Sequence, residues 1–479
     1  MKRILLVILA LFALTEGYSQ VGINILNPDS SAVLQLESNK KGLGLTRLTS
    51  AQMNGIVNPL KGLTIFNTED SVVEYWNGEC WLKAWEKNCY YCDFQMTITP
   101  PADTLDRVVD DSIFATVTLS HTHGTGQINT TWTAVPPSGV QIYQQGPNII
   151  DTSGSFQIVV KADVFAGSGN VPILITAYCG DQVRFVTYNV YIKPCVIVDI
   201  PMDDYNYDVQ SRNSTLLPPG ARECVLLTVY SGVNVHSNNP AQPSLTIGNL
   251  DPLSIVGITN NGSILGRGGD GGGVTTTTAG GQPGGNGGNA LDLTTRTVMH
   301  NFGQIYGGGG GGGSVGYSWT SPSIPIIGSI SLGFGSGGGG GSENGQGGAT
   351  PSGVSLGFYR AGNAATSGVN SVPGQGGQIT TTIPISISVA TINITPNVVG
   401  GNGGAFAQPG TGTTFNVNVQ ICVSIPFIGT VCPVSLNLPI PTGGAPGTPG
   451  LAVKRNGNPM QGLADGIYNS FQVKGSVAP

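Results

Sequence analysis

Residues 305–316 read IYGGGGGGGSVG, and the seven consecutive glycines at 307–313 decide what the surrounding part of the chain can fold into. Glycine loses more conformational entropy on ordering than any other residue, so such a run folds only if its backbone gains many interactions at once. The glycines cluster in runs without a strict three-residue period, which excludes collagen. Two alternatives remain: a disordered segment, or a bundle of extended left-handed helices whose backbone groups pair with one another.

Glycine is concentrated in the second part of the chain. Residues 1–256 contain 18 of the 74 glycines, and the remaining 223 residues contain 56. That second part carries only ten charged residues, which excludes a highly charged disordered tail. Strand-like inserts separate the glycine runs, unlike a flexible linker, and favour the ordered bundle. The net charge of −6 leaves no basic stripe, so we expect no nucleic-acid partner.

The first residues have the pattern of a secretory signal. Lys2 and Arg3 precede an apolar stretch at 4–14, and Gly17 and Ser19 occupy the small-residue positions of a cleavage site. We therefore expect a signal peptide at residues 1–19 and a chain that is secreted to the cell surface. No later segment approaches about 18 uninterrupted apolar residues, so we expect no membrane span.

Eight cysteines in an exported chain predict structural disulfides. Cys89 and Cys92 also form a C-x-x-C, which with Cys80 leaves open a redox motif or a zinc site. Cys422 and Cys432 flank a segment whose residues 427–430 can form a hairpin turn, and this spacing predicts that the two are joined. The other pairings stay open.

The N-terminal module, residues 20–88, has short apolar runs between turn residues and one short helix expected at 50–56. It resembles a module of exported surface proteins of gliding Gram-negative bacteria. That resemblance implies a secreted surface protein and suggests the type IX export machinery, although residues 457–479 do not match the usual sorting domain. The resemblance rests on Val21, Gly22, Ile23, Asn27, Pro28, Ala32, Leu34, Leu36, Ser38, Lys41, Gly42, Arg47, Thr49, Gln52, Gly62, Leu63, Ile65, Asn67, Thr68, Glu74, Trp76, Asn77, Gly78 and Trp81.

Residues 89–195 are predicted to form strands throughout, at a spacing typical of an immunoglobulin-like β-sandwich. Apolar residues from Val186 to Ile192 alternate with polar ones, which indicates a strand with one buried face. The expected strands are 94–99, 113–119, 129–133, 156–160, 171–178 and 183–192.

A third β segment, the lead-in domain at 196–261, precedes the glycine-rich domain at 262–479. From residue 205 to the glycines at 307–313, the chain resembles the receptor-binding proteins of bacteriophage tails. The resemblance implies that the glycine-rich domain is a polyglycine-II bundle; the inserts after residue 313 do not match, so no receptor preference carries over. The matching positions include Tyr205, Asn206, Tyr207, Asp208, Val209, Gly232, Val233, Ile258, Asn260, Asn261, Gly262, Ile264, Gly266, Gly268, Gly269, Asp270, Gly271, Gly284, Gly285, Gly287, Gly288, Asn289, Ala290, Leu291, Asn301, Gly303 and Ile305.

The inserts are predicted to be β-hairpins that project from the bundle or cap it. The segment 323–329, SIPIIGS, reappears in form as 424–430, SIPFIGT, and each has the character of a hairpin tip. Apolar residues alternate with polar ones along 415–425 and again along 383–394. Such tips would be the most variable surface offered to a partner.

The residues contain no arrangement that indicates catalysis. Gly266, Gly268 and Gly271 satisfy G-x-G-x-x-G, but four threonines follow instead of a helix, so we reject a dinucleotide site. His121 and His123 are typical of solvated histidines rather than metal ligands. We expect no enzyme, no cofactor and no metal.

Aromatic residues beside the glycine runs are the candidate receptor contacts, because rigid aromatic side chains anchor many recognition surfaces. The alternative is that they cap the hydrophobic end of the bundle. The candidates are Tyr317, Trp319, Phe334, Phe358, Tyr359 and Arg360.

The sequence thus predicts a mainly β, modular, non-enzymatic adhesin. We expect its insert loops to bind a cell-surface glycan or an outer-membrane protein, held in place by a rigid bundle. A structural filament or extracellular matrix subunit and a carbohydrate-active enzyme are the alternatives.

Overall fold

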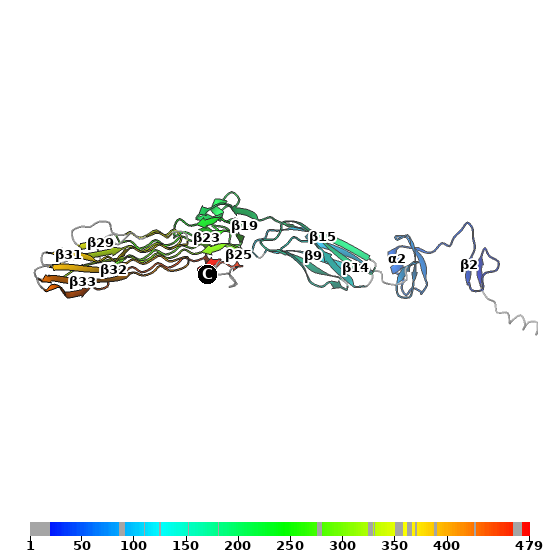
Figure 1. The fold of residues 1–479 in the computed structure, drawn as a ribbon. Helices are drawn as coiled ribbons and strands as arrows, with labels where there is room; N and C mark the ends of the chain where they lie inside the picture. The colour runs from blue at the N-terminus through cyan, green and yellow to red at the C-terminus, as the bar shows by residue number, and fades with distance from the viewer. Residues whose placement is uncertain are drawn as a thin grey trace, which may run out of the picture.

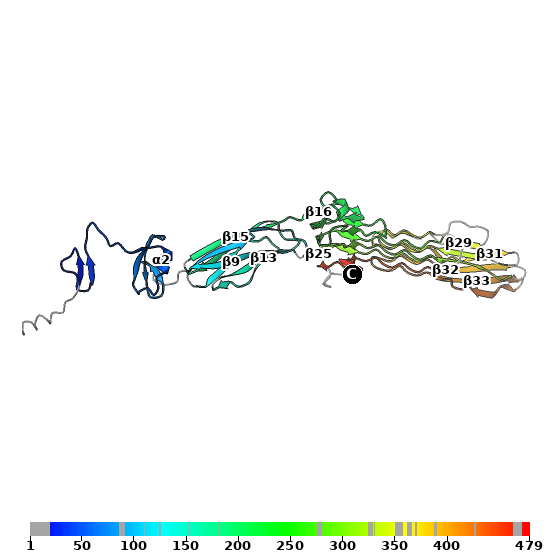
Figure 2. The same ribbon diagram turned by 180° about the vertical axis from the view of Figure 1, so that it is seen from behind.

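The protein is an elongated chain of β modules (Figure 1). The computed structural model describes residues 20–85, 92–109, 111–123, 126–151, 153–180, 182–274, 280–323, 329, 331–349, 358–361, 366–368, 371–387, 390–425, 428–462 and 472–479. The chain passes through the N-terminal modules to the glycine-rich end and then returns, so that its C-terminus lies beside the strands of the middle region (Figures 1 and 2). The fold is mainly β, as expected, and the helices of the described residues are the short α2 (Ser50–Asn54) and α3 (Val209–Arg212).

Residues 20–85 form two small sheets and one helical turn. The side chain of Thr49 accepts a hydrogen bond from the backbone N–H of Gln52, and the side chain of Gln52 accepts one from the backbone N–H of Thr49, which fixes the start of α2. The helix expected at 50–56 is present but ends at Asn54. The sheets are β1 (Val21–Ile23) with β2 (Leu34–Leu36), and β3 (Arg47–Leu48), β4 (Thr64–Asn67), β5 (Val72–Trp76) and β6 (Trp81–Lys83).

Residues 93–192 fold as two sheets around one hydrophobic core. Tyr188, Val190 and Ile192 are buried and the intervening Asn189 and Tyr191 are exposed, as the alternation predicted. Each expected strand is present; the immunoglobulin-like assignment stays a prediction. One sheet is β12 (Ile149–Ile150), β10 (Ile128–Thr133), β14 (Gly169–Cys179), β15 (Gln182–Ile192) and β8 (Ala102–Leu105); the other is β11 (Val140–Gln145), β13 (Ser153–Ala162), β9 (Ile113–His123) and β7 (Asp93–Thr99).

Residues 196–306 and 453–478 wind into a solenoid with three faces. Each turn adds one short strand to each of three parallel sheets, and aliphatic side chains fill the interior. The expected boundary at 261/262 falls inside one turn of this solenoid, since the strands on either side of it belong to sheets that share the core. The faces are β16 (Val196–Ile200), β19 (Cys224–Val229), β22 (Ile255–Asn260), β25 (Arg296–Asn301) and β36 (Met460–Gln461); β17 (Asp204–Tyr205), β20 (Asn234–His236), β23 (Ser263–Leu265), β26 (Gln304–Tyr306) and β37 (Val473–Lys474); and β18 (Tyr207–Asp208), β21 (Leu245–Thr246), β24 (Leu291–Asp292), β35 (Val453–Lys454) and β38 (Val477–Ala478).

The glycine-rich segments leave the solenoid after β23 and after β26 and extend side by side (Figure 1). In the central run, 307–313, successive backbone N–H groups donate hydrogen bonds to three different neighbouring segments. The same segment accepts from every third residue of the run. A Cβ atom built on Gly310 would lie 2.0 Å from the carbonyl oxygen of Gly447, so only glycine fits there. The N–H groups of Gly308 and Gly311 donate to Gly288 and Gly285, those of Gly309 and Gly312 to Ser342 and Gly339, and those of Gly310 and Gly313 to Gln408 and Thr411.

The carbonyl groups of the same run accept from three further segments with the same period. The backbone of neighbouring segments therefore surrounds the central run on all sides. This close approach leaves no space for side chains and explains why residues 307–313 are all glycine. The carbonyls of Gly309 and Gly312 accept from Gly269 and Gly272, those of Gly307, Gly310 and Gly313 from Ala407, Gly404 and Gly401, and those of Gly308 and Gly311 from Gly450 and Gly447.

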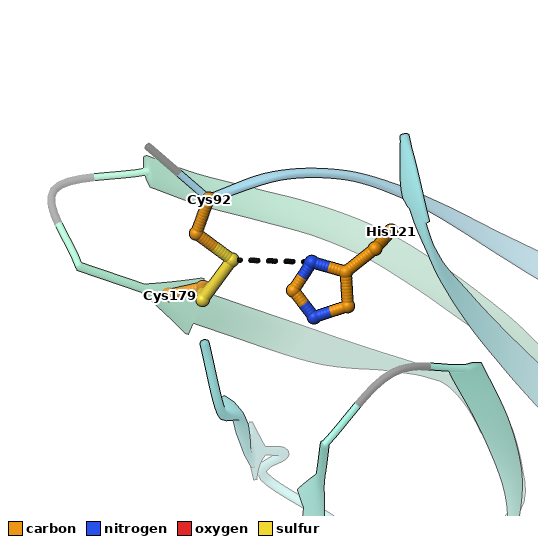
Figure 3. Close-up of side chains that lie close together, drawn as sticks. All are labelled: Cys92, His121 and Cys179. Carbon is orange, nitrogen blue, oxygen red and sulfur yellow. Dashed lines mark hydrogen bonds between the residues drawn. A yellow bond between two sulfur atoms is a disulfide. The ribbon is translucent and has the colours of Figure 1, made fainter. Parts of the chain in front are cut away.

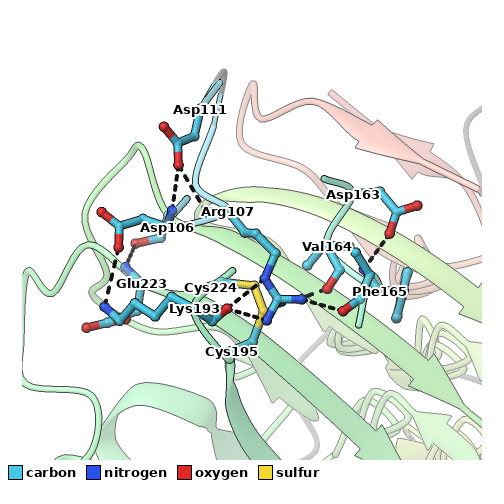
Figure 4. The surroundings of a disulfide bond; sticks show 12 residues. Asp106, Arg107, Asp111, Asp163, Val164, Phe165, Lys193, Cys195, Glu223 and Cys224 are labelled. Carbon is cyan, nitrogen blue, oxygen red and sulfur yellow. Dashed lines mark hydrogen bonds and ion pairs between the residues drawn. A yellow bond between two sulfur atoms is a disulfide. The ribbon is translucent and has the colours of Figure 1, made fainter. Parts of the chain in front are cut away.

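A disulfide ties the sandwich to the solenoid, and a buried arginine lies beside it at the base of the sandwich (Figure 4). Cys195, just after the sandwich, is bonded to Cys224 at the start of β19. Arg107 is 3% exposed and donates to the carbonyl oxygens of Lys193 and Ala166. The carboxylate of Asp111 accepts from the backbone N–H of Arg107. These contacts fix the loop at the base of the sandwich.

Candidate receptor-binding surface

The distal end of the bundle, opposite the solenoid, is closed by two sheets that share a core. Along β33, Phe415, Val417 and Val419 are buried while Asn416 is exposed, which confirms the first part of the predicted alternation. The alternation ends at Cys422, which is buried although it was expected on the polar face. The sheets are β27 (Val315–Thr320), β28 (Ser331–Ser336) and β29 (Phe358–Ala361), and β30 (Gln378–Ile379), β32 (Ala390–Val399), β33 (Thr414–Ile425) and β34 (Gly429–Asn437), with β31 (Ile383–Ile387) also paired to β32.

Three of the candidate aromatic residues lie in or against this core. Tyr317 is 7% exposed, and its ring centroid lies 4.9 Å from that of Phe415. Phe334 is 1% exposed and lies edge-on to the same phenylalanine. Trp319 is partly buried against the core. Because Tyr317 and Phe334 are buried, they cap the hydrophobic end of the bundle, which was the alternative to a receptor contact. For Trp319 a receptor contact stays a prediction.

The remaining candidates lie on β29, whose backbone pairs in parallel with β28. Phe358 is opposite Leu332, Tyr359 opposite Gly333, and Arg360 opposite Phe334. Their side chains lie outside the described part of the structure, so their receptor contact stays a prediction.

Strand β34 is an exposed strand of the distal end that carries apolar residues. The aromatic candidates from the sequence do not include any of its residues. All nine of its residues are exposed. Val434 pairs with Ile421 and Leu436 with Val419, so both lie on the face that carries the buried residues of β33. They extend past the edge of the core, at 39% and 37% exposure. Continuing the alternating pattern of 415–425 past the hairpin turn would have found them.

The hairpin of β33 and β34 carries the disulfide between Cys422 and Cys432. The pairing of Ile425 with Gly429 places a tight turn at the strand ends; of the expected tip at 427–430, Phe427 lies outside the described residues. In the related segment 323–329, residues 324–328 also lie outside them. The flanking strands β27 and β28 are antiparallel up to Thr320 and Ser331, as a hairpin requires.

The sequence motifs for metal and cofactor sites have other roles in the structure. Cys92 is bonded to Cys179, so it is neither half of a C-x-x-C pair nor a zinc ligand. Nδ1 of His121 lies 3.5 Å from the sulfur of Cys92 (Figure 3), but the disulfide leaves no thiolate for a metal. The side chain of His123 is outside the described residues. The glycines at 266, 268 and 271 belong to the extended bundle.

A family model matches the solenoid, the glycine-rich bundle and the distal sheets. The model described as phage tail fibre adhesin Gp38 matches residues 196–471, more than half of the chain. The chain belongs to this family. The Gp38 match begins at the first solenoid strand and includes the glycine-rich bundle and the distal sheets, so these parts form one family unit. A second model, described as a phage tail-like trimerisation region, matches residues 22–95.

Comparisons with individual proteins add little to the Gp38 assignment. No curated protein matches the chain. A family 123 glycoside hydrolase from Clostridium perfringens, known for glycolipid glycan hydrolysis, aligns at 8% identity and a TM-score of 0.18 over 25% of this chain and 31% of its own. That likeness carries no argument. No helix among the described residues combines the length and the apolar character needed to cross a membrane.

Proposed function

We propose that the protein is a secreted, non-enzymatic adhesin at the tip of a surface fibre. Its distal sheets would bind a glycan or a protein in the outer membrane of a target cell. Membership of the Gp38 family supports the fibre-tip role. The single observation that carries the placement of the binding surface is strand β34, which leaves apolar side chains uncovered at the end of the molecule.

We also infer that the bundle is polyglycine II. Hydrogen bonds that return to the same neighbour every third residue are the repeat expected of extended helices with three residues per turn. A core bonded on all sides by backbone holds the distal strands in a fixed arrangement. Little conformational freedom would then be lost when they contact a receptor, which favours affinity.

The export route and surface anchoring belong to the same proposal. The signal-like residues 1–19 lie outside the described structure, and type IX export rests on the sequence resemblance alone. Retention of the chain in the periplasm of a strain lacking the type IX machinery would support that route, and normal export from such a strain would contradict it.

The adhesin role is tested by attachment of labelled full-length chain to a panel of Gram-negative cells. Replacing Val434 and Leu436 together by serine should reduce labelling of a bound strain at least tenfold. Both side chains are exposed, so the fold should be retained. Ile197→Ser, at a 66% exposed residue of the solenoid, is the matched control and should leave attachment unchanged. Equal attachment of the tip variant and the control would contradict the proposal.

Two alternative functions would give different experimental results. A filament or matrix subunit would form polymers in negative-stain images of the purified chain. A carbohydrate-active enzyme would release sugars from the glycans of a bound strain.

A further inference from the structure

A cavity of about 730 Å³ lies where the glycine bundle meets the second face of the solenoid. That face, which contains β23, is at the opposite end of the bundle from the distal strands β31 and β33 (Figure 1). One wall of this cavity is formed by side chains from five short parallel strands that pair in register. Tyr205, His236, Leu265, Tyr306 and Lys474 occupy equivalent positions on successive turns. Successive turns of a parallel sheet are about 4.8 Å apart, so these side chains form one continuous row.

The alternation of the strands places this row on the outside. The preceding residues Val235, Ile264, Ile305 and Val473 are buried in the solenoid core. The row therefore faces away from that core, and the opposite wall of the cavity comes from Glu343, Asn344 and Phe406 of the bundle.

One part of the cavity is apolar and aromatic. Tyr306 and Phe406 pack at 5.1 Å between ring centroids, and Leu265 joins them in a small buried cluster. Tyr205 stacks on His236 at 5.5 Å and remains 50% exposed. An exposed tyrosine ring beside a cavity can stack on an apolar ring face of a ligand.

The other part carries polar groups that the protein does not fully satisfy. Glu343 is 5% exposed, and its Oε1 atom lies 3.4 Å from Nδ1 of His236. That nitrogen is buried and makes no hydrogen bond with any described group. The ammonium of Lys474 lies 4.5 Å from the Tyr306 ring centre and forms no ion pair among the described residues. Buried polar atoms without partners favour a ligand that supplies hydrogen bonds.

We propose that this cavity binds an uncharged mono- or disaccharide. A sugar ring offers an apolar face to Tyr205 and hydroxyl groups to Glu343, His236 and Lys474. The acids Asp203 and Glu343 and the base Lys474 line the cavity together. Hydroxyl groups suit this lining, because they donate to carboxylates and accept from an ammonium. The volume is in the range of small-molecule sites. This site is separate from β34, so it does not depend on the receptor proposal.

The test is binding of maltose and N,N′-diacetylchitobiose to the full chain, together with an array of bacterial surface glycans, followed by saturation-transfer NMR and calorimetric titration. We expect millimolar or tighter binding of an uncharged saccharide. Tyr205→Ala should weaken it at least tenfold, whereas Tyr205→Phe should keep it. Glu343→Gln should also weaken it, because one of the two carboxylate oxygens that can accept from sugar hydroxyls is replaced by an amide donor.

Tyr230→Ala is the matched control, since Tyr230 is similarly exposed at 44% but does not line the cavity. It should bind as the wild type does. Failure of every saccharide to bind, unchanged binding by Tyr205→Ala, or exclusive binding of charged saccharides would overturn the proposal. Cell attachment by the β34 variants is measured separately, so failure of one proposal leaves the other testable.

Discussion

Tyr188 places a hydroxyl group in the sandwich core without a partner. The residue is 0% exposed, and its oxygen makes no hydrogen bond with any described group. A buried polar atom without a partner costs about 1 to 3 kcal/mol. Tyr188→Phe should therefore raise the free energy of unfolding of the sandwich by about 1 kcal/mol, measured by urea titration. Tyr178→Phe, at a 41% exposed position, should have no effect; destabilisation by Tyr188→Phe would reveal a hydrogen bond.

Glu343 should make stability depend on pH in a predictable direction. Burial raises the pKa of its carboxyl group, against the lowering effects of His236 and of a hydrogen bond from Asn344. A raised pKa in the folded state means that the stabilisation is full below the unfolded value near 4.5 and is lost as the pH rises through the folded pKa. In Glu343→Gln, the melting temperature recorded from pH 4 upwards should fall less with rising pH than in the wild type. An unchanged slope would show that Glu343 does not titrate in this range.

The glycine run is the element on which the distal half depends. Gly310→Ala would place a methyl group 2.0 Å from the Gly447 carbonyl oxygen, and backbone on every side leaves no space for adjustment. We expect destabilisation by about 3 kcal/mol or more, seen as a lower melting temperature and faster proteolysis of the bundle. Gly412→Ala is the control, because a Cβ there meets no atom within 4 Å. Equal melting of both variants would contradict a close-packed bundle.

Elements with local patterns could be predicted from the sequence, and those made by distant pairing could not. Strand β15 was found because apolar and polar residues alternate along its second half, from Val186 to Ile192. The solenoid strands are often two or three residues long, too short for a period to show. Leu291 of β24 pairs with Val453 of β35, across the whole glycine-rich insertion. Only the folded chain reveals that the lead-in segment and the C-terminal residues form one unit.

The candidate site shows the same limit at the level of side chains. Composition located aromatic residues at the distal end, yet Tyr317 and Phe334 fill its core. Whether an aromatic residue caps a core or faces solvent depends on which sheet covers it. The exposed Val434 and Leu436 are ordinary strand residues by sequence, and only the edge position of β34 uncovers them.

At the scale of the whole molecule, the N-terminal end carries an uncovered apolar face, and we expect other copies of the chain to cover it. Strands β1 and β2 pair in register, Val21 with Leu34 and Ile23 with Leu36, and all four side chains are 44% to 52% exposed. A two-stranded sheet is at best marginally stable by itself in water. Similar segments of other copies would cover this apolar face, and the match to a phage tail-like trimerisation region at residues 22–95 favours three.

We therefore expect the purified chain to be a trimer by light scattering coupled to size exclusion. Ile23→Ser with Leu34→Ser should shift the mass to that of a monomer, because the apolar face that stabilises association would be polar. Ile197→Ser changes an exposed apolar residue of the solenoid, at 66% exposure, and should leave the trimer intact. A wild-type monomer, or a trimer that persists in the double variant, would contradict this interface. A trimer would present three tips to one cell, so we expect loss of the trimer to weaken cell attachment as well, without any change at β34.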